Sequence, residues 1–466
     1  MLTGNQGDRY GLQPMSRPLP GLVAFALALG ACADSTPPRA VVLITCDTLR
    51  ADRLGFHGWQ GGTSPRLDEL AAESLVFDAA WSTAPLTRPA VAALLTGRLP
   101  EELGFRDNRQ VLSAEATTIA ERLADSGIPC AAVVSNWVLR RLPELPSASV
   151  QQGFAHFDDR MTHSEAGRKD VKERLANETT DAALAWLDKS VNAERFFLWV
   201  HYQDPHGPYT PPSDVPLTVA PGDEPELGVG RDNRGIDCLP IYQVVDCERR
   251  PAVYRARYEA EIRFFDRELG PLLDGLRARG ILEHALVLFS ADHGESLGEH
   301  GYYFSHGHHL HQELVRVPLL VRVPSGDRRG RVAAPVSHLD VFPTVLRAFG
   351  LDPGATRGSD LLGALDEERV LPQALRGGWA ATSARYRLLV DFSGKKLFDR
   401  ALDPLEEHDL STARPELVRE LSAGRRAFVQ RLALTPLPAA TPELDAEGRA
   451  DFDALGYGGE EDEPRR

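Results

Sequence analysis

Two apolar segments, far apart in the sequence, end in residue types that commonly bind metal ions. Residues 41–47 (VVLITCD) end in Asp47, and residues 286–295 (LVLFSADHGE) contain Asp292 and His293. Carboxylates and an imidazole together suit a divalent cation; the mixed set favours Zn²⁺ or Mn²⁺, with Ca²⁺ or Mg²⁺ as alternatives. We therefore predict a metal site formed by Asp47, Asp292 and His293.

Thr87 is a candidate nucleophile for this metal site. It opens residues 87–98 (TRPAVAALLTGR), in which Pro89 and Gly97 are placed as at the start and end of a short helix. A helix N-terminus favours an anion through its free N–H groups and its dipole. A cation bound to the Thr87 oxygen would lower the pKa of the hydroxyl and activate it. The alternative is that Thr87 only caps the helix.

Several histidines are candidates for binding substrate and transferring protons. We expect His206 and His306 to stabilise charge on the substrate, and one of them to protonate the leaving alcohol. The alternative for each is a structural hydrogen bond. A second metal site is a weaker hypothesis, which draws on a further set of residues: His201, Asp204, His300, His308, His309 and His311.

The elements that must position these residues alternate between strands and helices. Strands are predicted at residues 41–45, 131–134, 196–201, 286–290 and 319–323. Helices are predicted at residues 117–126, 177–189, 254–279 and 343–350. This alternation predicts an α/β fold with a large, mostly parallel sheet flanked by helices. Ligands gather beyond the carboxyl ends of such strands, so the predicted metal ligands could meet there.

Shorter elements follow from about residue 355. They are predicted strands at residues 386–391 and 396–398 and an amphipathic helix near residues 415–432. We expect a catalytic domain at residues 40–354 and a smaller α+β C-terminal subdomain at residues 355–433. Residues 434–466, rich in Pro, Glu, Asp and Gly, are expected to form a loosely ordered tail.

The N-terminal residues are typical of a bacterial secretion signal. Arg9 and Arg17 precede apolar residues 21–29, which are too few to span a bilayer but suit the apolar region of a signal peptide. Residues 29–32 (LGAC) resemble a lipobox, which implies removal of residues 1–31 and a lipid on Cys32. This predicts a protein anchored in the cell envelope that faces the periplasm or the exterior; the alternative is that Cys32 is an ordinary small residue.

Net charge argues against one class of partner, and the positions of the cysteines predict their chemical state. The net charge of −15 argues against a nucleic-acid partner, because such proteins need clustered Lys and Arg. Cys238 and Cys247 are close enough in sequence for a disulfide in an oxidising envelope. Cys46 and Cys130 lie beside apolar runs and are expected to be buried thiols.

The ordered set of motifs resembles the sulfatase family of the alkaline phosphatase superfamily, over residues 40 to about 432. The matching segments are residues 47–55 (DTLRADRLG), 87–98, 201–209 (HYQDPHGPY), 292–295 (DHGE), 297–301 (LGEHG), 306–307 (HG), 316–319 (RVPL), 340–344 (DVFPT) and 403–406 (DPLE). The resemblance implies a hydrolase with an α/β fold, a metal-binding Asp in the first segment and a nucleophile at position 87.

Departures from the family pattern bear on the chemistry. Sulfatases oxidise a Cys or Ser to formylglycine, and Thr87 offers no such route. Ala90 and Val91 replace the Ser and Arg of the family motif, and the Gly-Lys-Trp-His stretch of the family reads Val-Ser-Asn-Trp at residues 134–137. A threonine nucleophile at this position resembles the arrangement in phosphodiesterases and phosphoryl transferases of the superfamily.

These observations predict a metal-dependent hydrolase that prefers phosphate mono- or diesters of a small molecule, lipid or glycan. Three alternatives are a sulfuric ester hydrolase, a phosphoryl-group transferase and a catalytically inactive binding protein of the envelope. The related transferases carry several spanning helices, whereas this sequence has no second long apolar segment.

Overall fold

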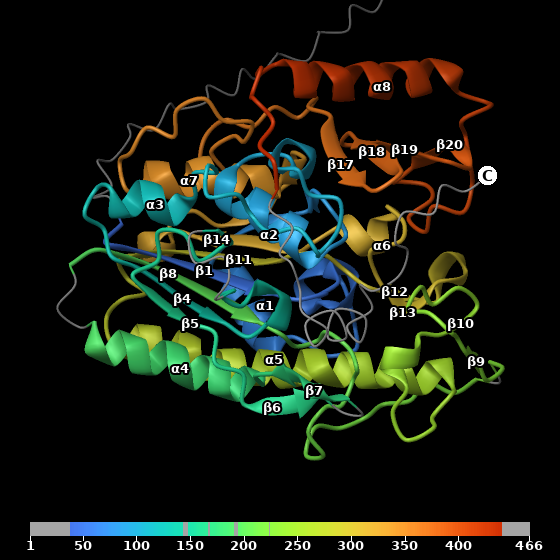
Figure 1. Ribbon diagram of the computed structural model, residues 1–466, viewed down its shortest axis with the longest axis horizontal. Helices are drawn as coiled ribbons and strands as arrows, with labels where there is room; N and C mark the ends of the chain where they lie inside the picture. The colour runs from blue at the N-terminus through green and yellow to red at the C-terminus, as the bar shows by residue number, and fades with distance from the viewer. Residues whose placement is uncertain (1–37, 143–147, 166–167, 191–193, 223, 440–466) are drawn as a thin grey trace, which may run out of the picture. The chain divides into compact units, whose positions relative to one another are not determined.

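An eight-stranded sheet lies at the centre of the protein (Figure 1). The computed structural model describes residues 38–142, 148–165, 168–190, 194–222 and 224–439. The strand order is β15-β2-β14-β11-β1-β8-β4-β5. In chain order the strands are β1 (Ala40–Cys46), β2 (Leu75–Phe77), β4 (Cys130–Val134), β5 (His156–Asp158), β8 (Phe196–Tyr202), β11 (Ala285–Ala291), β14 (Leu319–Arg322) and β15 (Gly330–Val332).

The inner strands are mostly apolar because helices cover both faces of the sheet; the polar exceptions in β1, β8 and β11 are Thr45, His201 and Ser290. Every residue of β1, β8 and β11 is buried. β1 pairs in parallel with both β8 and β11, whereas β14 runs antiparallel to β11. The predicted α/β fold with a mostly parallel sheet is confirmed.

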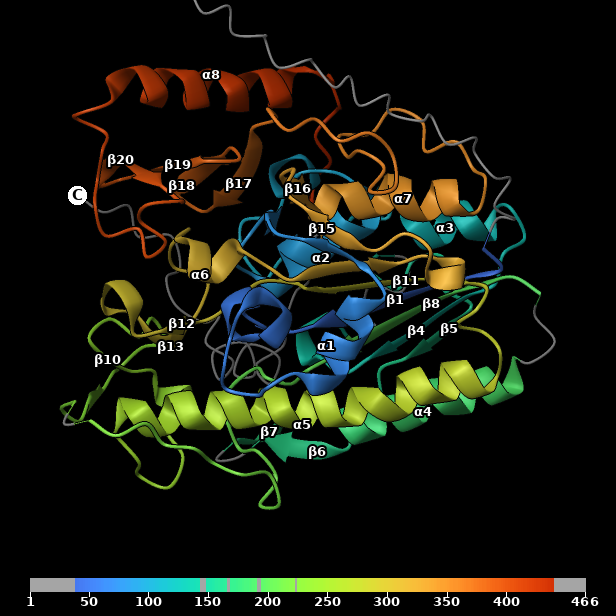
Figure 2. The ribbon, with the colours of Figure 1, turned by 180° about the vertical axis from the view of Figure 1, so that it is seen from behind.

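Two layers of helices enclose the sheet (Figures 1 and 2). α4 and α5 cover one face, and α2, α3 and α7 cover the other. α1 packs against α5. The helices are α1 (Pro65–Ala72), α2 (Thr87–Thr96), α3 (Ile119–Ala124), α4 (Ala176–Lys189), α5 (Pro251–Ala278) and α7 (Val341–Ala348).

The ends of α2 and α3 follow from local side chains. α2 ends at Gly97, whose φ of 66° is left-handed, and a Cβ there would lie 2.9 Å from the side chain of Thr356. α3 begins with a capping box: Thr118 Oγ1 accepts from the N–H of Glu121 at 3.1 Å, and Glu121 Oε2 accepts from the N–H of Thr118 at 2.9 Å.

A four-stranded antiparallel sheet and a helix form the C-terminal subdomain. They are β17 (Leu371–Leu375), β18 (Gly378–Thr382), β19 (Tyr386–Asp391), β20 (Gly394–Asp399) and α8 (Pro415–Gln430). α8 packs on β17, β18 and β19. In this subdomain the guanidinium of Arg387 lies 2.5 Å from Glu406, and both side chains are fully buried. The predicted small subdomain with strands and a helix is therefore present.

Short elements complete the described chain. β3 (Ala80–Trp81) pairs with β16 (Val336–Ser337), β6 (His163–Glu165) with β7 (Arg168–Glu173), β9 (Gly228–Val229) with β10 (Cys238–Leu239) and β12 (Ser296–Leu297) with β13 (Tyr303–Ser305). A further short helix, α6 (Gln312–Val315), follows β13.

The cysteines differ in part from the expectation. Cys46 and Cys130 are buried free thiols, as expected. Cys238 and Cys247 are also free, so the structure does not contain the disulfide considered for them. The reason is local: Cys238 lies in β10 with its sulfur against Gly230, whereas Cys247 is exposed at a residue with a φ of 56°.

The two ends of the sequence lie largely outside the described residues. The predicted signal peptide, Cys32 and residues 440–466 are among those not described. The first residues of the expected tail are held in place: the N–H of Leu437 donates to the carbonyl of Glu102 at 2.7 Å, and Arg98 donates to the carbonyl of Thr435 at 2.5 Å. Among the described helices, none is both long and apolar enough to cross a membrane.

Candidate active site

Asp47, Asp292 and His293 meet at the carboxyl edge of the central sheet. The parallel register pairs Cys46 with Ala291, so the residues that follow leave β1 and β11 side by side. One potential ligand atom from each of the three buried side chains lies within 4.8 Å of the others. His293 Nε2 is 3.8 Å from Asp47 Oδ1 and 3.5 Å from Asp292 Oδ2.

Hydrogen bonds determine which atoms of Asp47, Asp292 and His293 are available to bind a metal ion. Asp292 Oδ1 accepts from the N–H groups of Thr48 at 3.1 Å and His293 at 2.7 Å. His293 Nδ1 donates to the carbonyl of Gly294 at 2.9 Å, which leaves the lone pair on Nε2. Asn136 donates to Asp47 Oδ2. Asp47 Oδ1 has no hydrogen-bond partner in the described part of the chain.

This arrangement fits a divalent cation. Burial raises the pKa of Asp47, and the charges of Asp292 and Glu295 raise it further. Burial also raises the pKa of Asp292. Among the described residues, only the imidazoles of His201 and His293 lie within ion-pair distance of the two carboxylates. Adjacent buried carboxylates are costly unless a positive charge is added, and a cation between them would supply it.

Thr87 lies beside the metal-ligand group. It is the first residue of α2, its side chain is fully buried, and its Oγ1 is 3.3 Å from His293 Nε2. Leu86, and not Thr87, occupies the N-cap position, so the capping alternative is wrong. The Thr87 hydroxyl faces the buried ligands, where an activated oxygen could attack a bound ester.

The amides of α2 offer less to an anion than the sequence suggested. The N–H of Arg88 donates to Asn108 Oδ1 at 2.9 Å, and the N–H of Ala90 donates to the carbonyl of Leu86 at 3.0 Å. Pro89, between them, has no N–H. The helix dipole remains, but most N–H groups of the first turn are already used.

His206 and His306 line the same site. The His306 ring centre is 4.6 Å from that of His293 and 5.2 Å from that of His206. His306 Nδ1 lies 3.2 Å from Glu295 Oε1, and Tyr209 donates to the other oxygen of Glu295 at 3.1 Å. Burial lowers the pKa of His306, so its neutral form is favoured. His306 thus lies beside His293, and His206 lies beside His306.

Asn136 and Glu295 are site residues that the sequence reasoning did not assign. Asn136 follows β4 just as Asp47 follows β1, so the strand-end rule applied to β4 would have found it. Glu295 lies three residues after Asp292 and orients His306. Its partner is eleven residues further along the chain, and no sequence pattern indicates that contact.

The residues considered for a second metal site are not gathered into one. His300 Nε2 and His309 Nδ1 each lie 3.9 Å from Glu313 Oε1, while His311 Nδ1 pairs with Glu406 at 2.8 Å. Within the described ranges, only Asp47, Asp292 and His293 form a close group of three metal-ligand residues. The rings of His300 and His311 stack with their centres 3.6 Å apart, but Glu406 holds Nδ1 of His311.

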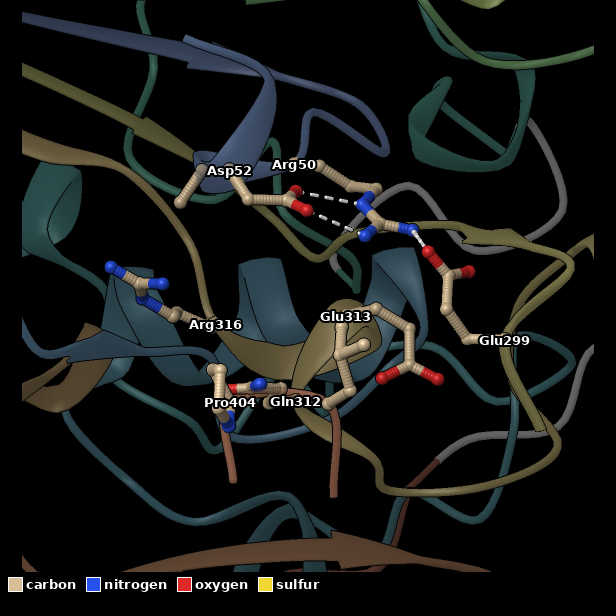
Figure 3. Close-up of a pocket in the computed structure, with 9 residues that line it drawn as sticks. Arg50, Asp52, Glu299, Gln312, Glu313, Arg316 and Pro404 are labelled. Atoms are coloured by element: carbon tan, nitrogen blue, oxygen red, sulfur yellow. Dashed lines mark hydrogen bonds and ion pairs between the residues drawn. The ribbon is translucent and has the colours of Figure 1, made fainter. Parts of the chain in front are cut away.

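A charged cavity of about 150 Å³ lies near these histidines (Figure 3). Arg50 crosses its wall, at 2.7 Å from Asp52 and 2.8 Å from Glu299. Arg50 also donates to the carbonyl of Glu295 at 3.0 Å, which connects the wall to the active site. Burial raises the pKa of Glu313 in this cavity to about 8. Of the lining residues, Arg50 pairs with Asp52 and Glu299, and Thr87 and the metal ligands are not in the lining.

The fold and the ligand group together define a hydrolase of the alkaline phosphatase superfamily. The family model for sulfatases matches residues 39–351, and the chain therefore belongs to the sulfatase family. The chain is 24% identical to the uncharacterized sulfatase YidJ of Escherichia coli (strain K12), over 79% of this chain and 82% of that protein. It is 23% identical to the N-acetylglucosamine-6-O-sulfatase of Bacteroides thetaiotaomicron, over 74% of this chain and 75% of that protein.

Solved structures share the fold. BT4656 in complex with its substrate, D-glucosamine-2-N,6-O-disulfate, has a TM-score of 0.68 and 19% identity, covering 84% of this chain and 98% of that one. The phosphonate monoester hydrolase of Agrobacterium radiobacter has a TM-score of 0.67 and 19% identity, covering 87% and 100%. The protein is an enzyme, a sulfatase-family hydrolase of ester bonds.

Proposed function

We propose that the protein hydrolyses phosphate mono- or diesters, with Thr87 as the nucleophile. The observation that carries this proposal is the 3.3 Å separation between Thr87 Oγ1 and His293 Nε2, beside the carboxylates of Asp47 and Asp292. A threonine cannot be converted to the formylglycine that sulfatases use. Its hydroxyl can attack phosphorus directly.

The reaction proceeds in two displacements at phosphorus. The Thr87 oxygen bonds to phosphorus and expels the alcohol, which takes up the proton that Thr87 loses, and a phosphothreonine remains; water then attacks phosphorus, and the released Thr87 oxygen regains a proton from that water. When bound, a divalent cation would lower the pKa of the hydroxyl and withdraw charge from a phosphoryl oxygen. His206 and His306 lie where they can bind the phosphoryl oxygens or protonate the leaving alcohol.

The charge of the site favours a substrate with one negative charge. Asp47 and Asp292 balance a divalent cation, and among the described residues no arginine or lysine pairs with either carboxylate. A phosphodiester brings one charge to this neutral centre, whereas a monoester dianion brings two. We therefore expect diesters to be hydrolysed faster than monoesters with the same leaving group.

The test is to trap the intermediate and remove the hydroxyl. Full-length protein is mixed with an isotope-labelled aryl phosphodiester, quenched in acid and digested. Mass spectrometry should find a labelled phosphoryl group on the peptide that contains Thr87. Thr87→Val keeps the shape without the hydroxyl and should lose at least about 100-fold in turnover, the order expected when a catalytic group is lost. It should keep much of its metal.

Thr87→Ser is the matched control, because it keeps a hydroxyl at the same position and should retain measurable turnover. The proposed nucleophile would be wrong if Thr87→Val turned over substrate as fast as Thr87→Ser. An absence of label at Thr87 under conditions that accumulate an intermediate would also show that Thr87 is not the nucleophile.

Hydrolysis of sulfate esters is the second candidate function. The observation in its favour is that relatives of the chain are themselves sulfatases. Attack of Thr87 on sulfur would leave a threonine sulfate with no aldehyde-forming exit, so we expect sulfate esters to be slower. The same aryl group presented as a phosphodiester, phosphate monoester, phosphonate and sulfate ester would separate the candidates.

We also propose that a lipid on Cys32 anchors the enzyme in the bacterial envelope. The support is the LGAC sequence that follows a short apolar segment. A lipid- or glycan-derived ester at the periplasmic or exterior face would then be within reach of the active site.

A further inference from the structure

His201 is a fully buried histidine that lies behind Asp47. It is on β8, and the parallel register pairs it with Thr45 of β1, two residues before Asp47. Its Nδ1 is 2.8 Å from Thr45 Oγ1. Its Nε2 is 4.0 Å from Asp47 Oδ2 and has no hydrogen-bond partner among the described residues.

The contacts of Thr45 determine which nitrogen of His201 carries the proton. The indole N–H of Trp199 can only donate, and it donates to Thr45 Oγ1 at 2.8 Å. The Thr45 hydroxyl is fully buried, and His201 Nδ1 is the acceptor that its own proton can reach. In the neutral ring, Nδ1 therefore accepts and Nε2 carries the hydrogen. A chain of donors thus runs from Trp199 through Thr45 and His201 toward Asp47.

We infer that His201 is a positioning residue, whose Nε2–H holds Asp47 Oδ2 so that Oδ1 stays directed at the metal. Asn136 already donates to the same Oδ2 atom, and Oδ1 is the atom without a partner. The separation of 4.0 Å exceeds a hydrogen bond, so the inference requires the carboxylate and the ring to move closer when a cation binds. This inference rests on the metal centre of the proposed function.

An outer hydrogen bond of this kind has a known effect on metal sites. Carboxylate ligands depend on partners that fix their orientation, and loss of such a partner typically costs about 10–100-fold in metal affinity or activity. His201 would therefore act on the cation through Asp47 without touching it. Direct coordination by Nε2 is the competing role, and it requires that nitrogen to be unprotonated.

The first experiment uses two amides that mimic different ring nitrogens. His201→Gln can place an N–H near the Nε2 position, whereas His201→Asn reaches only as far as Nδ1. Zn²⁺ affinity is measured on each full-length protein by competition with a chelator. His201→Asn should bind Zn²⁺ about 10–100-fold more weakly than wild type, and His201→Gln should recover most of that loss. Equal affinity in wild type and His201→Asn would overturn the inference.

The second experiment observes the proton directly. Histidine-selective ¹⁵N NMR of the Zn²⁺-loaded protein should show Nε2 of His201 protonated and Nδ1 unprotonated. Thr45→Val, which removes the hydroxyl but keeps the shape, should abolish this fixed tautomer. An unprotonated Nε2 in the loaded wild-type protein would overturn the inference, because the ring would then be a ligand.

The two proposals fail in different ways. Undiminished Zn²⁺ in Asp292→Asn and His293→Ala would show that the metal centre itself is wrong. Loss of Zn²⁺ from those variants together with full affinity in His201→Asn would reject only the role of His201.

Discussion

Asp292 and His293 carry both the charge and the lone pair that a cation needs at this site. Asp292 is held by two backbone N–H groups, so its carboxylate is already oriented. His293 is held through Nδ1, which directs Nε2 toward the carboxylates and toward Thr87. Little reorganisation is required for these two side chains to bind a metal. Substitutions at Asp292 and His293 therefore test the proposed metal centre most directly.

Asp292→Asn and His293→Ala should each lower the bound metal and abolish turnover. Each change removes one of three candidate ligands, so the loss of activity should exceed the 10–100-fold that is typical of outer partners. Metal content is measured by elemental analysis of the purified proteins, alongside turnover. Asp188→Asn, a surface carboxylate paired with Arg279, is the control and should keep both. Normal metal and normal turnover in both site variants would reject the centre.

At the residue scale, the sequence predicted those ligands that follow directly from strand ends. Asp47, Asp292 and His293 each come after a long apolar strand, and parallel strands bring such residues together. Glu295 could not be assigned because its role depends on the pairing of β12 with β13, which brings His306 beside it. The disulfide between Cys238 and Cys247 was wrong because closeness in sequence does not set side-chain direction.

At the scale of elements, the long buried strands and the long helices were predictable, whereas the three-residue strands were not. β1, β8 and β11 are seven-residue strands that are apolar apart from Thr45, His201 and Ser290, and such runs are typical of buried strands. β2, β5 and β15 have three residues each, too few to show a period. Their pairing depends on neighbours far away in sequence.

Glu406 forms a buried ion pair within the C-terminal subdomain and also contacts His311 outside it. It accepts from Arg387 of β19 at 2.5 Å and from His311, beside α6, at 2.8 Å. Burial opposes ionisation of Glu406, but the charge of Arg387 and the contact with His311 outweigh it and lower the pKa to about 2. The ionised carboxylate is therefore the form that the folded protein stabilises.

Glu406→Gln should destabilise the protein by about 3–5 kcal/mol at neutral pH, because it leaves Arg387 buried without a counter-charge. The folded pKa lies below the ordinary value of about 4.3, so the wild-type contribution is complete above that pH and is lost as the pH falls toward 2. Urea unfolding of wild type and Glu406→Gln from neutral pH toward pH 2 measures this contribution to the free energy of unfolding.

The difference in stability between the two proteins should shrink as the solution is acidified. Glu407→Gln, at the exposed neighbouring residue, is the matched control and should change the unfolding free energy little. A Glu406→Gln variant as stable as Glu407→Gln at neutral pH would show that the pair contributes nothing net.

At the scale of the whole molecule, the proposed lipid on Cys32 predicts where the enzyme works. Cys32→Ser should leave the protein without a lipid and move it from the membrane fraction to the soluble fraction. In this proposal the lipid on Cys32 is the membrane anchor, so its loss should make the shift nearly complete. Fractionation and labelling with an acyl-chain precursor check this. A variant that stays membrane-bound and labelled would reject the lipobox interpretation.

The pairing of β1 with β11 sets the order in which a newly made chain can mature. Thr48 contacts Asp292 across 244 residues of sequence, so Asp292 and His293 are made only after more than half of the chain. Until β11 arrives, one edge of β1 has no partner, and such an edge is prone to pair with other chains. The three ligands of the proposed centre come together only after β1 and β11 have paired, so a metal-loaded molecule would be one in which this pair has formed.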